Sequence, residues 1–145
     1  MLSIKQTVDS LCHKHDTRDP FEIARQLGII VLYEPLGSIR GFYSRSKRQK
    51  FIHINHNLCS EQQRIVCAHE LGHAVLHPDS NTPFLRSNTF FSVNKFEIEA
   101  NRFMVQLLIT DSQLLEYAQY GYTVSQLAQS AGIPEALIQY RIENI

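Results

Sequence analysis

Two histidines spaced four residues apart, His69 and His73, lie in a segment with the pattern of a single helix. Small and apolar residues recur there at steps of three and four, from Ile65 to Leu76. Side chains four residues apart share one face of a helix, so the two imidazoles point the same way. This segment therefore predicts a helix with two potential metal ligands on one face.

Glu70 follows the first of these histidines, completing the pattern His-Glu-Leu-Gly-His. Two imidazoles and one carboxylate suit a single zinc ion and leave a fourth position for a water whose pKa falls toward about 7. Glu70 is then the expected general base, which takes a proton from that water and passes it to the leaving amine. The alternative is an ordinary helix with two hydrogen-bonded histidines.

The third ligand is expected from the next predicted helix, residues 96–109, which contains Glu97 and Glu99. We choose Glu97, because it shares a helix face with apolar residues, where a carboxylate needs a partner. Asn101, one turn later, is placed to hydrogen-bond a ligand histidine. In the alternative interpretation, Glu97 is the capping-box partner of Asn94.

Three further histidines receive other roles. His77 continues the stripe of His69 and His73, but it lies two turns from His69, or about 12 Å along the axis. That distance is too long for one ion, so His77 should pack or hydrogen-bond beneath the site. His13 and His15, beside Cys12, are expected at the surface.

The remaining patterns predict an α+β fold that is mostly helical. A small three-stranded antiparallel sheet is expected to pack on the helix that carries the two histidines. Expected strands are Ile29–Tyr33, Gly41–Ser44 and Phe51–Asn55. Expected helices cover residues 4–11, a segment from Pro20 to Gly28 and a segment from Ser60 to Pro78, with short helices in residues 110–145. Asp19 should cap the second of these helices. Capping boxes are expected at Ser60–Gln63 and at Thr123–Gln126. Asp79–Asn88 is expected to be a loop.

Composition limits the possible classes of protein. The chain has 145 residues, enough for one domain, and 14 Lys plus Arg balance 14 Asp plus Glu. No overall field therefore attracts nucleic acid or membrane. The first residues lack the apolar core of a signal peptide, and three cysteines suit reduced thiols, so we expect a cytoplasmic protein. A basic cluster is interpreted as a solvated hairpin tip: Arg45, Lys47, Arg48 and Lys50.

Several motifs together resemble the ImmA/IrrE family of gluzincin-like metallopeptidases. They are RGFY, FIHINHN, HELGHAVLH, EIEANRFMVQLLI and the tail LAQSAGIPEALIQYRIENI, in this order. The resemblance covers most of the chain. The sequence departs from the family at Met104, where Ala is usual, and at Ile109-Thr110, where Met-Pro is frequent; neither position belongs to the expected metal site.

The resemblance implies a single zincin-like domain, residues 1–145, with one zinc ion held by His69, His73 and Glu97. Here Glu97 opens the family pattern E-x-x-A-N, and Glu70 is the catalytic residue. The resemblance also implies one specific protein substrate, typically a helix-turn-helix repressor of a mobile element or stress regulon. It implies no membrane or nucleic acid partner, and it leaves the oligomeric state open.

Two other classes of function are considered. The tail has helix-turn-helix proportions, with Thr123–Ala131 and Pro134–Glu143 as its two helices, which would suit a DNA-binding regulator. Only Gln139 and Arg141 on the second helix could read DNA, so this hypothesis ranks below the peptidase. The third hypothesis is an antirepressor that binds metal and partner without hydrolysis.

Overall fold

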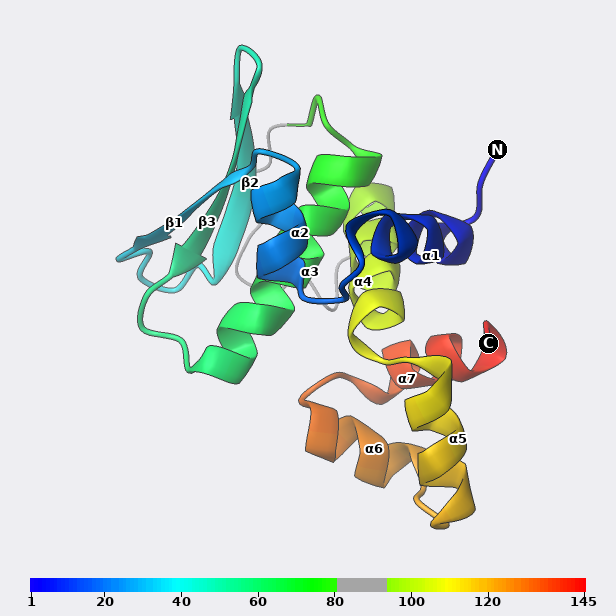
Figure 1. Cartoon of the computed structure of the whole chain (residues 1–145). Helices are drawn as coiled ribbons and strands as arrows, with labels where there is room; N and C mark the ends of the chain where they lie inside the picture. Colours follow the sequence, from blue (N-terminus) through cyan, green and yellow to red (C-terminus); the bar gives the residue numbers. More distant parts are fainter. Residues whose placement is uncertain (81–93) are drawn as a thin grey trace.

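The computed structural model describes residues 1–80 and 94–145. Its elements follow one another as two helices, three strands and five helices (Figure 1). Their bounds are α1 Ile4–His15, α2 Pro20–Gln26, β1 Ile30–Glu34, β2 Gly41–Ser46, β3 Gln49–Asn55, α3 Ser60–Leu76, α4 Lys95–Leu108, α5 Asp111–Gln119, α6 Val124–Ala131 and α7 Glu135–Glu143. The predicted α+β class is confirmed. Residues 81–88 of the predicted loop lie outside the described residues.

The sheet is mixed, so the prediction of a purely antiparallel sheet was wrong. The strand order is β1-β3-β2, with β2 antiparallel and β1 parallel to β3. Consecutive strands β1 and β2 do run in opposite directions, but they do not pair, because β3 lies between them. The connection of residues 35–40 is long enough to leave room for an inserted strand.

Asn55, the last residue of β3, holds this connection in place. Its side-chain amide donates to the carbonyl oxygens of Gly37 and Ile39, each at 2.9 Å. Its backbone N–H donates to the carbonyl of Arg40 at 2.8 Å. The connection therefore crosses the end of β3, and a buried amide supplies the partners that its carbonyl groups need.

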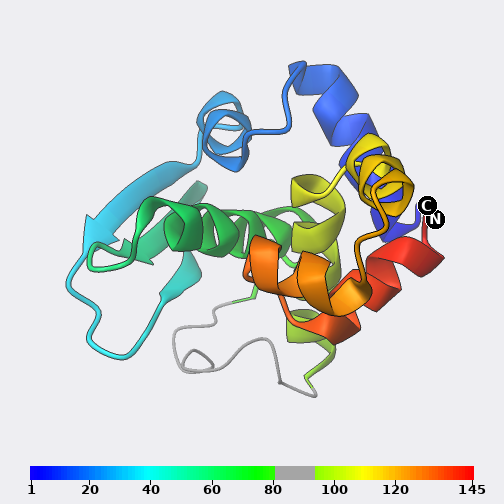
Figure 2. The same ribbon diagram turned by 90° about the horizontal axis from the view of Figure 1, so that it is seen from below.

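Helix α3 lies between the sheet and α4, as the two views of the ribbon show (Figure 1, Figure 2). The inward side chains of β2 and β3 are Tyr43, Ile52 and Ile54, all fully buried. They pack with the apolar residues of α3, so nine consecutive residues of α3, Val66–Ala74, are buried. A helix buried on both sides can carry polar side chains at a protected site.

Gly72 allows α3 and α4 to approach closely. A Cβ atom at this position would lie 3.1 Å from Cβ of Phe103 and 3.2 Å from the Cα atom of Ala100. Because Phe103 is fully buried, it has little room to move away. The missing side chain thus sets the distance between the two helices that carry the expected ligands.

Gly41 is a tighter contact, and we predict that Gly41→Ala destabilises the fold. The added Cβ would lie 2.5 Å from both the carbonyl oxygen of His53 and Cγ1 of Val66, so strand or helix must shift. Overpacking of this kind costs about 1–3 kcal/mol or more. Chemical denaturation should show a lower free energy of unfolding for Gly41→Ala.

The control for this prediction is Gly37→Ala. Gly37 has a φ of 63°, but no atom of residues 1–80 or 94–145 lies within 4 Å of the position that an added Cβ would take. The substitution should therefore cost only the left-handed strain, about 1–2 kcal/mol. Wild-type stability of Gly41→Ala would contradict the close contact between β2, β3 and α3.

Helix caps agree with the sequence in several places and differ in one. Asp19 caps α2, followed by Pro20, and Thr123 and Gln126 form the predicted capping box of α6. The predicted Ser60–Gln63 capping box of α3 was wrong. The N-cap is Cys59, without a side-chain hydrogen bond, and the amide of Gln63 donates to the carbonyl of Leu58 at 3.1 Å. The side chain of Gln63 therefore reaches beyond the N-cap residue, Cys59, to the residue before it.

The side chain of Arg141 on α7 links the C-terminal helices to the rest of the fold through a hydrogen bond and an ion pair. This side chain is 2% exposed. Its Nε donates to the carbonyl of Ile109 at 2.7 Å, and its Nη2 contacts Asp111 at 2.6 Å. Asp111 also contacts Lys5 of α1 at 3.3 Å. That residues 1–145 act as one domain stays a prediction.

Within residues 1–80 and 94–145, no helix has the combined length and apolar character needed to cross a bilayer. All three cysteines are free thiols, with Cys12 and Cys67 buried and Cys59 exposed. Burial raises the pKa of the Cys67 thiol, which keeps it neutral in the core.

Candidate metal centre

The carboxylate of Glu97 meets both histidines of the motif. Its Oε2 lies 2.9 Å from Nε2 of His69, and its Oε1 lies 2.8 Å from Nε2 of His73. The histidines come from consecutive turns of α3 and the carboxylate from the first turn of α4. The structure thus brings together the three residues that the sequence selected as ligands.

All three groups are shielded from solvent. His69 is 3% exposed, and His73 and Glu97 are fully buried. The two imidazole rings lie edge to face, with centroids 5.0 Å apart. Such burial is costly for a carboxylate without compensation, so its contacts define the chemistry of the site.

The charge of Glu97 follows from competing effects. Burial alone raises the pKa of a carboxyl group, but the hydrogen bonds and charges of His69 and His73 outweigh it. The pKa of Glu97 therefore lies well below its usual range. The group is an anion at neutral pH, which is the form that binds a cation.

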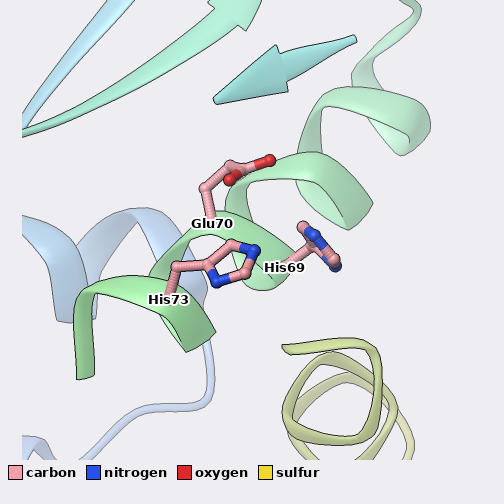
Figure 3. Close-up of side chains that lie close together, drawn as sticks. All are labelled: His69, Glu70 and His73. Atoms are coloured by element: carbon pink, nitrogen blue, oxygen red, sulfur yellow. The ribbon is translucent and has the colours of Figure 1, made fainter. Parts of the chain in front are cut away.

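Glu70 belongs to the same cluster. Ligand atoms of His69, Glu70 and His73 all lie within 4.8 Å of one another, and Glu70 is 2% exposed. Figure 3 shows the two imidazoles next to each other and Glu70 leaving α3 on the side of the strands. Glu97 is the carboxylate that contacts both Nε2 atoms, whereas Glu70 is placed beside them.

The donor set fits a metal ion. Two imidazole nitrogens and a carboxylate are a usual ligand set for a borderline divalent cation. A tetrahedral ion with bonds of about 2.0–2.1 Å places neighbouring ligand atoms about 3.3 Å apart. The observed 2.8 and 2.9 Å separations are a few tenths of an ångström shorter, so small side-chain rotations suffice.

The sequence profile of the IrrE N-terminal-like domain, peptidase family M78, matches residues 24–143 of this chain. This range includes all four residues of the cluster. The chain belongs to this family.

Two curated proteins are similar to this chain over most of its length. The uncharacterized immunity region protein 2 of Bacillus phage phi105 is 44% identical over 135 residues, covering 92% of this chain and 85% of the relative. Metallopeptidase ImmA of Bacillus subtilis strain 168 is 34% identical over 146 residues, covering 98% and 85%. The family is one of metallopeptidases, which implies a metal ion, and His69, Glu70 and His73 form a possible site for it.

Asn94 and Asn101, the two asparagines near Glu97, differ in how well they match expectation. The side chain of Asn94 does cap α4, accepting from the N–H of Phe96 at 2.9 Å and of Glu97 at 3.4 Å. The Glu97 carboxylate meanwhile contacts the imidazoles. Asn101 is buried one turn after Glu97. The Nδ1 atom of His73, on the other side of the ring from the proposed ligand atom Nε2, contacts His77 instead of Asn101.

His77 lies beneath the site, as the sequence predicted. Its Nδ1 is 3.1 Å from Nδ1 of His73, and its ring stacks on Phe96 with centroids 4.2 Å apart. Burial and the neighbouring His73 lower the pKa of His77. The sequence analysis did not predict that Glu99 lies 3.6 Å from His77. The available signal was the presence of two glutamates, Glu97 and Glu99, near the start of the same helix.

The other candidate groups do not join the centre. His13 and His15 lie on α1, and His15 contacts Gln26 at 2.7 Å. The basic cluster does occupy the β2–β3 hairpin, as predicted. Two of its members are tied to the fold, since Arg45 contacts Asp79 at 2.6 Å and Lys50 donates to the carbonyl of Ala74 at 2.9 Å.

Proposed function

We propose that this chain is a zinc-dependent endopeptidase in which His69, His73 and Glu97 hold one zinc ion and Glu70 is the general base. The observation that carries the proposal is the meeting of both Nε2 atoms with the carboxylate of Glu97, with Glu70 beside them. Zinc suits two imidazoles and one carboxylate, and when bound it supplies a Lewis acid that activates water and polarises a carbonyl group.

Each protein group then has a distinct task. The anionic Glu97 would balance part of the charge of the ion that it would hold together with the two imidazoles. Glu70 takes a proton from the attacking water and delivers it to the nitrogen of the leaving amine. Its burial beside the two histidines excludes bulk water from this proton transfer.

The proposed substrate is one specific intracellular protein, with a helix-turn-helix repressor of a mobile element as the leading candidate. The name of the phage relative places that protein in an immunity region, and the name of the Bacillus subtilis relative makes that protein a metallopeptidase. The first name supports a role in phage immunity, and the second supports hydrolysis of a protein. A narrow substrate range would also protect other cellular proteins.

The DNA-binding alternative is disfavoured by the tail. Arg141, one of two residues expected to read bases, is buried and bonded to Asp111 and to the carbonyl of Ile109. Residues 110–145 contain one Lys or Arg and four Asp or Glu, a net charge of 1 − 4 = −3. An acidic module with its arginine buried is a poor ligand for phosphates.

A cleavage assay tests the proposed function. The zinc-loaded protein should cut the helix-turn-helix repressor encoded beside it, and mass spectrometry should detect two complementary fragments. A metal chelator should abolish the fragments, and added zinc should restore them. If the repressor binds but stays intact under all these conditions, the third hypothesis, an antirepressor without hydrolysis, replaces the peptidase.

A further inference from the structure

His77 is a buried imidazole that the proposed reaction does not use directly. It follows the last turn of α3, where its backbone N–H donates to the carbonyl of His73 at 2.8 Å. Its ring stacks on Phe96 at the start of α4, and the residue as a whole is 7% exposed. Its ring therefore has one defined orientation, set by both helices of the metal centre.

A row of three polar side chains begins at His73 and ends at the surface. Nδ1 of His73 lies 3.1 Å from Nδ1 of His77, which is a hydrogen-bond distance. Nε2 of His77 lies 3.6 Å from Oε1 of Glu99, which is an ion-pair distance and slightly longer than a hydrogen bond. Glu99 is 30% exposed, whereas the two histidines are buried. The row thus connects a proposed ligand to a solvated carboxylate on α4.

The proton positions in this row follow from metal binding. An imidazole nitrogen that binds a metal carries no hydrogen, so a neutral His73 bound through Nε2 carries its hydrogen on Nδ1. That N–H can only donate, and the facing Nδ1 of His77 must accept. The hydrogen of a neutral His77 then sits on Nε2, the nitrogen that faces Glu99.

We propose that His77 and Glu99 are positioning residues, which hold His73 in the tautomer and ring orientation that metal binding through Nε2 requires. This inference rests on the proposed function in taking His73 as a ligand. It gives Glu99 a role different from that of Glu97, although both carboxylates lie on the first turns of α4. An accepting partner on the far nitrogen also makes the ligand nitrogen a better donor to the metal.

The second proposed ligand offers an internal contrast. Nδ1 of His69 is buried, and it has no hydrogen-bond partner among the described residues 1–80 and 94–145. His73 therefore has an orienting contact that this part of the structure does not provide for His69. We expect changes in the partner of His73 to affect the metal centre without any direct contact with the ion.

The test compares two substitutions of His77 in the full chain. His77→Phe keeps a flat ring that can stack on Phe96 but removes the acceptor. His77→Asn places its amide oxygen near the position of Nδ1 and so restores an acceptor. Loss of a partner of this kind weakens metal binding by about 10–100-fold. Zinc affinity, measured by competition with a chromophoric chelator, should fall in this range for His77→Phe and return most of the way for His77→Asn.

Two further measurements separate positioning from folding. Thermal unfolding in chelator should show that the Phe and Asn variants are both folded at the temperature of the zinc assay, so that a difference in zinc affinity does not reflect unfolding. Nitrogen-15 NMR of the zinc-loaded wild type should show the hydrogen of His73 on Nδ1 and that of His77 on Nε2. Glu99→Leu should weaken zinc binding less than His77→Phe does, because water can replace the partly exposed carboxylate.

Each possible result has a distinct meaning. Wild-type zinc affinity in His77→Phe, or a loss that His77→Asn does not restore, would overturn the positioning role while leaving the peptidase intact. His77 with its hydrogen on Nδ1 in the zinc-loaded protein would overturn it as well. A wild-type protein that binds no zinc would instead overturn the proposed function, and the positioning role with it.

Discussion

Glu70→Gln should abolish peptide hydrolysis while zinc stays bound. The amide is nearly the same size as the carboxylate, so the buried position beside His69 and His73 should accept it. It cannot take a proton from water, and general base catalysis contributes about 10²–10⁴-fold to rate. Cleavage of the repressor should fall by this factor, with zinc affinity near that of the wild type.

The measurement needs both readouts on the same preparation. Fragment formation over time gives the rate, and chelator competition gives the zinc affinity. Glu61→Gln on the same helix is a suitable control, because Glu61 is an exposed residue of the first turn of α3. Unimpaired cleavage by Glu70→Gln would show that another group transfers the proton, and loss of zinc would make Glu70 a ligand.

Glu97→Ala should have the second large effect, namely loss of the metal. The substitution removes the carboxylate that contacts both Nε2 atoms at 2.8 and 2.9 Å and leaves a cavity in a fully buried position. Loss of a direct ligand should cost more than the about 10–100-fold typical of a ligand's partner. Zinc affinity by chelator competition should therefore fall further than in any variant of His77 or Glu99.

Glu99→Gln is the matched control, since it changes the other carboxylate on the same helix. Its Oε1 lies 3.6 Å from His77 and not at the metal centre, so zinc binding should fall far less than in Glu97→Ala. If Glu99→Gln lost zinc and Glu97→Ala retained it, the assignment of the third ligand would be reversed. The comparison therefore decides between the two glutamates that the sequence offered.

Acid should also release the metal through Glu97. Because the pKa of Glu97 is lowered in the folded chain, its ionised form stabilises the fold above the ordinary carboxyl range. That contribution is lost as the pH falls toward the lowered folded-state pKa. Because a carboxylate ligand must be deprotonated to bind a metal, zinc release should accompany this protonation, and chelator absorbance during an acid titration should follow it.

The sequence predicted those features of the candidate site that depend on residues close together in the chain. Helical spacing placed His69 and His73 on one face, and the apolar face of the next helix selected Glu97 over Glu99. Both inferences use interactions within one or two turns. They therefore needed no knowledge of how distant segments pack.

Contacts between residues far apart in the sequence could not be predicted from such local patterns. The parallel pairing of β1 depends on Asn55, which bonds to a connection 16 to 18 residues earlier, and the sequence around it resembles any strand end. The buried state of Arg141 depends on a carbonyl 32 residues away. Polar residues with distant partners look like surface residues until the fold is known.

The contacts of Arg141 have a consequence for the architecture of the whole enzyme. Since its guanidinium joins α7 to the end of α4 and, through Asp111, to α1, the last helix is bound to the same helix that presents Glu97. A chain shortened before α7 would leave the carbonyl of Ile109 without its donor and uncover the apolar residues that pack on Ile138. Shortening the chain at its C-terminal end would thus loosen the support of a ligand that lies far away in the sequence.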